Sequence, residues 1–294
     1  MTSPWNSSAS PNGTSPEPVE YFVDSRLPLT FDWEDWFQLC CPPFDAPDAL
    51  AHFEDRLERG TENALQLCGD LGARGTWFCL ADQANRHPAL LRRIMDAGHR
   101  IALHGLDHRR AFSMDRSQFR VWISEGKARI EDLAGVEVQG FRAPEWSLRL
   151  GAETFLEELA ALGFSFDSSR APLSLLGDPH WPRRPHLAEG TLWEFPPPVA
   201  GLGPFTVPLW GWGLRILPEF WLSQRLHSLA RADAGTPLTL HPWELDATQP
   251  ALPGASWGHR FAHRAGLRGY EERLRRLFKG ITLIPIEDWL GSNV

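Results

Sequence analysis

Short apolar runs alternate with amphipathic helical segments from residue 25 onward, and no other feature of the chain restricts its fold as strongly. Strand-forming residues dominate the runs at 27–31, 75–80, 99–103, 136–141, 164–166, 192–195, 237–240 and 281–284. Helical periodicity separates many of them, at 61–71, 88–97, 115–133, 152–162, 219–230 and 270–279. Repeats of strand, helix and strand fold into parallel strands joined by right-handed crossovers. The pattern therefore predicts an α/β domain built around a barrel-like parallel sheet.

Polar clusters follow five of these predicted strands. Asp32, Glu34 and Asp35 come directly after the first strand, and His104 to His108 come after the third. The other three clusters begin at Arg142, Asp167 and His241. In parallel barrels the carboxyl ends of the strands meet on one face, which is where catalytic side chains gather. We therefore expect these clusters to converge although they span more than two hundred residues.

His104 and His108 have a spacing that suits a metal ion. Two imidazoles separated by three residues can converge on one cation, and a carboxylate from elsewhere can complete a three-ligand face with an open position for water. Glu34 shares a strand face with Asp32 and is the favoured third ligand. Asp35 takes that place if the strand has already turned. Such a histidine pair also occurs by chance, so the prediction of a metal site depends on the presence of the other polar clusters in the same chain.

Composition excludes several classes of function. The net charge is −8 and no basic stripe is present, which argues against nucleic acid as a partner. No run of 18 apolar residues occurs, so we expect no transmembrane segment. Residues 1–24 are rich in Ser, Pro, Asn and Gly without an apolar core, which predicts a disordered tail and no secretory signal. We therefore expect a cytoplasmic protein whose four cysteines, Cys40, Cys41, Cys68 and Cys79, are free thiols.

The domain organisation is predicted as one catalytic domain over residues 25–294. Residues 170–236 break the strand–helix rhythm and are dense in Pro and Trp. We interpret them as an insertion of loops and short strands over the catalytic face, or as ordinary surface elaboration. Residues 245–294 form a C-terminal extension. With 14 tryptophans in the chain, some indoles outside the strands are candidates for stacking on sugar rings.

The five clusters, in this order, resemble the motifs of the polysaccharide deacetylase family, the carbohydrate esterases of family 4 with NodB homology. The matching segments are Thr30-Phe31-Asp32, His104 to His108, Arg142-Ala143-Pro144, Asp167-Ser168 and Leu240-His241. Residues 30–37, 241–246 and 260–276 are also similar to a subgroup found with bacterial exopolysaccharide loci of the exosortase and PEP-CTERM type. The resemblance implies a distorted, incomplete (β/α) barrel and a divalent metal ion, most often zinc.

The chain departs from the family pattern in three places. The first motif usually has two adjacent aspartates, whereas here the acids are Asp32, Glu34 and Asp35. Glu145 stands where the third motif usually ends in tyrosine. The stretch between Asp167 and His241 is longer than usual because it contains the predicted insertion.

The resemblance implies hydrolysis of N-acetyl groups on amino sugars of a polysaccharide or its lipid-linked precursor. In that chemistry Asp32 would be the general base and His241 the general acid. Arg142 would pair with Asp32, Asp167 would orient His241, and the backbone N–H of Glu145 would bind the oxyanion. His104 and His108, with Glu34 or Asp35, would hold the metal.

Two other functions stay open at this point. The first is hydrolysis of a small cyclic amide, as in allantoinase-like relatives, although a small substrate has little need of the Trp-rich segment. The second is a non-catalytic sugar-binding protein that keeps the fold, although the complete set of polar clusters argues against it.

Overall fold

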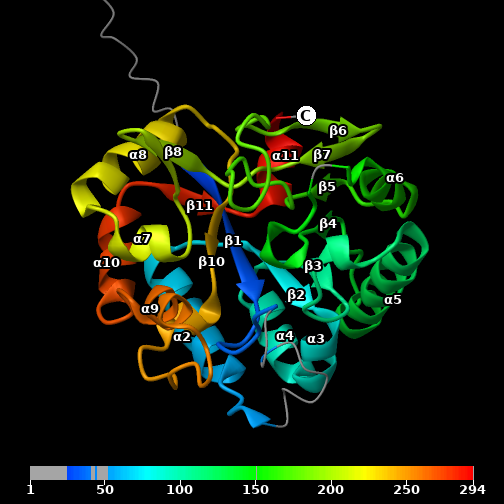
Figure 1. Ribbon diagram of the computed structural model, residues 1–294, viewed down its shortest axis with the longest axis horizontal. Helices are drawn as coiled ribbons and strands as arrows, with labels where there is room; N and C mark the ends of the chain where they lie inside the picture. The colour runs from blue at the N-terminus through cyan, green and yellow to red at the C-terminus, as the bar shows by residue number, and fades with distance from the viewer. Residues whose placement is uncertain (1–24, 41–43, 45–51, 150, 294) are drawn as a thin grey trace, which may run out of the picture.

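The computed structural model describes residues 25–40, 44, 52–149 and 151–293. A curled sheet with helices outside it dominates the chain (Figure 1). Its strand order is β10-β1-β2-β3-β4-β5-β7-β6, and β11 also pairs with β1. The strands are β1 (Arg26–Trp33), β2 (Thr76–Leu80), β3 (Arg100–Gly105), β4 (Gly140–Phe141), β5 (Phe166–Asp167), β6 (His186–Glu189), β7 (Leu192–Glu194), β10 (Leu238–Leu240) and β11 (Thr282–Ile284).

All pairings in this sheet are parallel except that of β6 with β7. The sheet curls without joining β10 to β6, so the barrel is incomplete. This confirms the predicted fold class, and every predicted strand is present.

Helices cover the outer face of the sheet: α2 (Leu57–Leu71), α3 (Ala81–Arg86), α4 (Pro88–Asp96), α5 (Arg116–Ala134), α6 (Glu153–Ala161), α8 (Glu219–Arg231) and α10 (Tyr270–Leu277). Asp115 caps α5 in a capping box with Gln118. The first helix does not begin at residue 61, as the range 61–71 predicted. The helix begins one turn earlier at Leu57, and the Thr61 hydroxyl donates to the Leu57 carbonyl and accepts the Trp33 indole N–H.

The two faces of the sheet are packed differently. On the outer face, Phe31 stacks on Trp77 within the main hydrophobic core. The inner face is filled at one end by α11 (Ile286–Asn293), whose Ile286 and Trp289 pack with a smaller cluster that includes Phe78. Polar side chains occupy the inner face at the carboxyl ends of the strands. The inner face therefore has an apolar end packed by α11 and a polar end.

Residues 170–236 contain both sheet and covering elements. β7 continues the parallel sheet beside β5, and α8 leads into β10. The remainder forms a separate hairpin of β8 (Val199–Leu202) and β9 (Phe205–Pro208), followed by α7 (Trp212–Ile216). The segment therefore supplies parts of the barrel as well as its cover. The division into domain, insertion and extension stays a prediction.

Some sequence predictions fall outside the described residues, among them the tail at 1–24 and Cys41. The other three cysteines, Cys40, Cys68 and Cys79, are buried free thiols, as predicted. None of the helices in the described ranges combines the length and apolar character needed to cross a membrane.

Candidate metal and catalytic site

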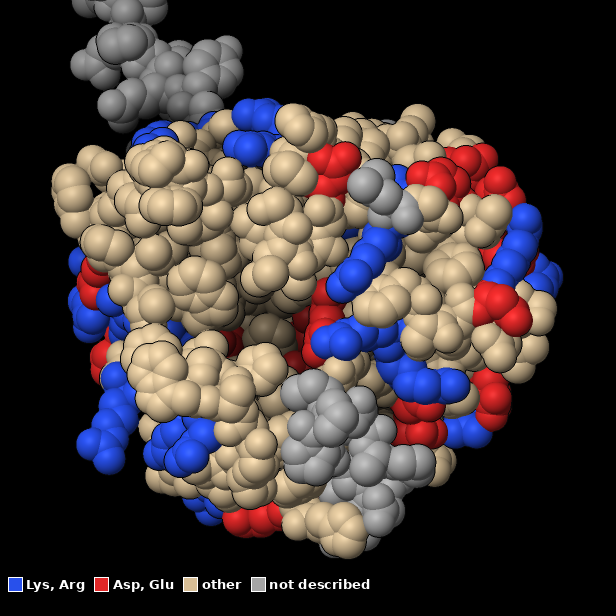
Figure 2. All heavy atoms as spheres, viewed as in Figure 1, with Lys and Arg blue, Asp and Glu red and all other residues tan. Residues whose placement is uncertain are grey.

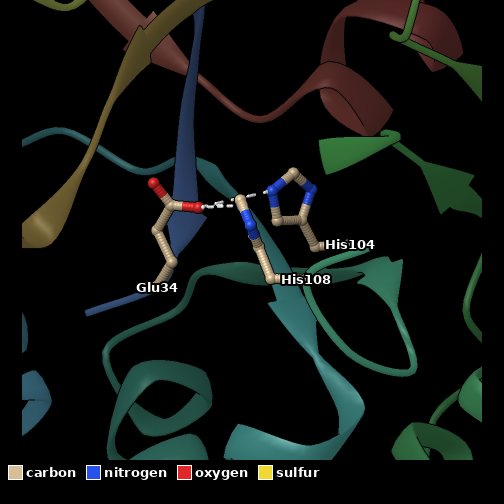
Figure 3. A group of neighbouring side chains, drawn as sticks. All are labelled: Glu34, His104 and His108. Atoms are coloured by element: carbon tan, nitrogen blue, oxygen red, sulfur yellow. Dashed lines mark ion pairs between the residues drawn. The ribbon is translucent and has the colours of Figure 1, made fainter. Parts of the chain in front are cut away.

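Glu34, His104 and His108 come together at the carboxyl ends of β1 and β3 (Figure 3). Each offers a ligand atom, and the three atoms lie within 4.8 Å of one another. The Glu34 Oε2 atom is 2.7 Å from His108 Nε2 and 3.7 Å from His104 Nε2. Burial would raise the pKa of Glu34, but the charge of His108 and the other imidazoles close to the carboxylate hold that pKa well below its usual range.

Neighbouring groups fix the two imidazoles. His104 Nδ1–H donates to the Arg142 carbonyl oxygen at 2.8 Å, and because that oxygen can only accept, His104 Nε2 is left unprotonated and available as a ligand. His108 Nδ1 lies 3.3 Å from Cys40 Sγ, whose thiol also donates to the His108 carbonyl. This contact of Cys40 could not be predicted, because nothing in the spacing of Cys40 along the chain links it to His108.

Asp35 is turned away from this cluster. Its carboxylate accepts the backbone N–H groups of Trp36 at 2.7 Å and Arg56 at 2.8 Å. Burial raises the pKa of Asp35 to about 6. Of the two acids left open by the sequence, the structure brings Glu34 to the histidines and uses Asp35 to hold the following loop.

Asp32 and Arg142 form a fully buried ion pair beside the cluster. Arg142 Nη1 donates to Asp32 Oδ1 at 2.6 Å and to the Thr30 hydroxyl at 3.0 Å. Its other nitrogens donate to the carbonyl and hydroxyl of Ser168, and its guanidinium lies 4.1 Å over the Phe78 ring. With this number of partners Arg142 has one defined position, so it fixes Asp32 in turn.

His241 lies close to the carboxylates of both Asp32 and Glu34. Its Nε2 atom is 3.8 Å from Asp32 Oδ2 and 3.7 Å from Glu34 Oε1. Its Nδ1 atom lies 3.1 Å from Glu244 Oε2, and Glu244 is itself paired with Arg215 Nε at 2.9 Å. Burial opposes the charge on His241, but Glu244, Glu34 and Asp32 raise its pKa to about 9.

The expected contact between Asp167 and His241 is absent, which corrects the sequence-based role of Asp167. Asp167 accepts a hydrogen bond from the Ser169 hydroxyl, which in turn accepts the backbone N–H of Ala143. Asp167 also lies in register with Glu194 on β7. Burial and the Asp167 charge raise the pKa of Glu194 well above its usual value. Asp167 thus supports the turn after β4.

Glu145 lies in that turn, the short 3₁₀ segment η2 (Pro144–Trp146). Glu145 and Trp146 both have positive φ, 53° and 48°, a backbone conformation that costs energy and clusters at functional sites. The Glu145 carboxylate accepts the Cys40 backbone N–H and pairs with Arg110. Its side chain therefore ties the turn to the loop after β1.

Aromatic rings line one wall of the site. Trp243, in the 3₁₀ segment η3 (Pro242–Leu245), stacks on His241 and on His263, with ring centroids 5.4 Å and 4.5 Å apart. Its indole N–H donates to Glu34 at 3.3 Å. Sequence reasoning missed Arg215, Trp243 and His263. Figure 2 shows a hollow on this face with acidic side chains in its walls.

Two family models match the chain in succession. Residues 43–166 match the model described as "Polysaccharide deacetylase", and residues 168–290 match a domain of unknown function, DUF3473. A peptidoglycan deacetylase of Helicobacter pylori is 27% identical over 125 residues, which is 42% of this chain and 42% of that protein. The chain thus matches less than half the length of this curated relative.

Solved structures share the fold at low identity. A candidate polysaccharide deacetylase from Mycobacterium smegmatis superposes with a TM-score of 0.62 at 21% identity, covering 92% of this chain and 91% of that one. A probable polysaccharide deacetylase from Pseudomonas aeruginosa gives a TM-score of 0.58 at 16% identity, covering 91% and 90%. These similarities support the incomplete barrel and its topology.

Proposed function

We propose that this chain, whose residues 43–166 match the polysaccharide deacetylase family model, is a metal-dependent hydrolase that removes N-acetyl groups from amino sugars of a polysaccharide or its lipid-linked precursor. The observation that carries the proposal is the placement of one metal-ligand group between two charged pairs. Glu34, His104 and His108 lie beside Asp32 with Arg142 and beside His241 with Glu244. A cytoplasmic location and a place in exopolysaccharide synthesis are part of the same proposal.

The residues present fit a divalent metal ion. Two histidine nitrogens and one carboxylate oxygen are a donor set used by catalytic zinc, and here they converge from β1 and β3. His104, His108 and Glu34 would hold the ion, and we propose zinc. Such an ion, when bound, lowers the pKa of water toward neutrality and polarises a carbonyl group.

Asp32 is the proposed general base. Arg142 occupies its Oδ1 atom, which leaves Oδ2 on the side of Glu34 and His241. From that position Oδ2 accepts the proton of the attacking water as the acetamide carbon becomes tetrahedral. The proposed donor to the resulting oxyanion is the backbone N–H of Glu145, in the strained turn after β4.

His241 is the proposed general acid. An amine is a poor leaving group unless it is protonated as the carbon–nitrogen bond breaks. With a pKa of about 9, His241 carries the required proton at neutral pH. Glu244 contacts Nδ1, so Nε2 is the nitrogen that gives its proton to the leaving amine.

Turnover of defined substrates tests the proposal. Purified protein is incubated with short oligomers of N-acetylglucosamine or N-acetylgalactosamine, and the released acetate is measured. We expect the wild-type protein to release acetate. A chelator should abolish this release and added zinc should restore it, whereas the His108→Ala variant should release none. Allantoin serves as the comparison substrate. Hydrolysis of allantoin without acetate release from any oligomer would instead support the cyclic-amide function, and inactivity on all substrates with zinc bound would support a sugar-binding role.

A further inference from the structure

Helix α9 (Trp257–Arg264) lies almost entirely outside the protein core. Of its eight residues only His263 is buried. Trp257 is 79% exposed and Phe261 is 53% exposed, and their rings stack on each other with centroids 5.5 Å apart. Large aromatic side chains in this state are unusual on a monomer and mark a surface that meets another body.

The charge around these rings has one sign. Residues 247–270 contain no aspartate or glutamate, in a chain whose net charge is −8. The same segment contains Arg260, Arg264 and Arg268, all exposed. In a helix, Arg260 and Arg264 fall beside Trp257 and Phe261, so the aromatic face has a basic margin. This surface is complementary to an anionic partner.

The neighbouring helix α7 extends the apolar area. Arg215 of α7 donates to the backbone carbonyls of Ala262, His263 and Ala265, so the two helices are in direct contact. Trp212 and Ile216 of α7 are exposed, and so is Phe220 at the start of α8. In Figure 2 the surface over α7, α8 and α9 is largely uncharged. Glu219, the acid next to Phe220, is paired with Arg276.

This surface flanks the mouth of the site. His263 of α9 stacks on Trp243, which stacks on His241, so the helix is attached directly to the catalytic wall. His263 and the aromatic pair lie on roughly opposite sides of the helix, because at about 100° per residue His263 is about 200° around the helix axis from Phe261 and about 240° from Trp257. Figures 1 and 2 place α9 in the foreground beside the hollow.

We propose that α9, together with the exposed residues of α7 and Phe220, docks the protein on the surface of an anionic lipid bilayer, with the mouth of the site facing the membrane. Helices that lie in the interface combine Trp and Phe on the apolar face with arginines at its edge, which is the pattern of α9. Phe220 and Ile216 favour lipid over a glycan, because neither side chain can donate or accept a hydrogen bond to a sugar.

Co-sedimentation with vesicles tests the proposal and is read without any turnover, so it stands or falls separately from the deacetylase activity. We expect the full chain to bind vesicles of phosphatidylcholine mixed with phosphatidylglycerol, to bind vesicles of phosphatidylcholine alone much more weakly, and to be released by salt. Arg260→Gln combined with Arg264→Gln should lower binding roughly thirtyfold, at about fivefold per arginine. Trp257→Ser combined with Phe261→Ser should lower it roughly tenfold or more.

Matched variants control for loss of charge or apolar surface elsewhere. Val121→Ser removes an apolar residue of 64% exposure from α5, and Arg92→Gln with Arg183→Gln removes two exposed charges. These variants should bind as the wild type does, and circular dichroism should show that all variants are folded.

Three results would overturn the proposal. One is failure of the wild type to bind either kind of vesicle. A second is equal loss of binding in the α9 variants and the controls. A third is binding of the α9 surface to polygalacturonate, or to a second copy of the chain in sedimentation velocity, with no binding to vesicles.

Discussion

Glu244→Gln should separate the effect of charge on His241 from the effect of shape. The amide keeps an oxygen that can accept from His241 but removes the carboxylate that, after the opposing effect of burial, contributes most to its raised pKa. That pKa is about 9, against an ordinary value of 6.5, a difference equivalent to about 3 kcal/mol. Glu34 and Asp32 also raise the pKa, so we expect the variant's value to fall by about one and a half to two and a half units.

The consequence depends on pH in a defined direction. The general acid must be protonated, so wild-type kcat/KM should fall as pH rises through about 9. In Glu244→Gln this limb should move toward neutrality. At about pH 8 the variant should then lose between roughly fourfold and thirtyfold, whereas at about pH 6 it should lose little. The assay is acetate release from an N-acetylglucosamine oligomer across this range.

The variant also leaves Arg215 buried without its carboxylate, which costs on the order of 3–5 kcal/mol. Thermal melts should therefore accompany the kinetics, and activity should be measured well below the unfolding transition. Asp167→Asn is the matched control, because Asp167 has no contact with His241 and should leave the alkaline limb in place. A loss in Glu244→Gln that is equal at all pH values, or a shifted limb in Asp167→Asn, would refute the assignment of Glu244.

Three further predictions concern the metal and the packing around it. His108→Ala should lower bound zinc to background by elemental analysis while circular dichroism stays unchanged, and full occupancy would exclude His108 as a ligand. Glu34→Gln should weaken zinc affinity tenfold or more. Asp35→Asn should chiefly lower the melting temperature, because the Asp35 carboxylate holds the loop after β1. The opposite result would exchange the roles of the two acids. Gly60→Ala should lower the free energy of unfolding in urea by about 1–3 kcal/mol, because the new methyl group would lie 2.8 Å from the Pro242 backbone. Unchanged stability would show that η3 can move.

Much of the site was predictable because the carboxyl ends of parallel strands lie at the same edge of a sheet. Asp32, His104 and Arg142 follow three predicted strands, and the structure brings them together there. The preference for Glu34 over Asp35 followed from the alternation of side chains along a strand, and the structure places Glu34 on the side of Asp32.

The partner of His241 was harder to predict. The order of motifs predicts Asp167 as this partner, whereas the structure pairs His241 with Glu244, three residues further along the chain. A local signal was present, since an acid three positions after the first residue of a helical turn can accept that residue's backbone N–H, and Glu244 does so for His241. Arg215 had no such signal, because its contact with Glu244 depends on how residues far apart in the chain fold back over the sheet.

The pairing of β1 has a consequence for how the protein is made. β1 carries Asp32 and pairs with β2 on one side, but its other partners β10 and β11 begin at Leu238 and Thr282, more than two hundred residues later. Domains fold as their chain emerges from the ribosome, but contacts of long sequence separation must wait for their partners. The first polar cluster therefore stays without its final geometry until synthesis has passed Ile284. A polypeptide that ends between residues 245 and 281 has every site residue but lacks β11, so the start of β1 is an unpaired edge and the product is a target for chaperones rather than an enzyme.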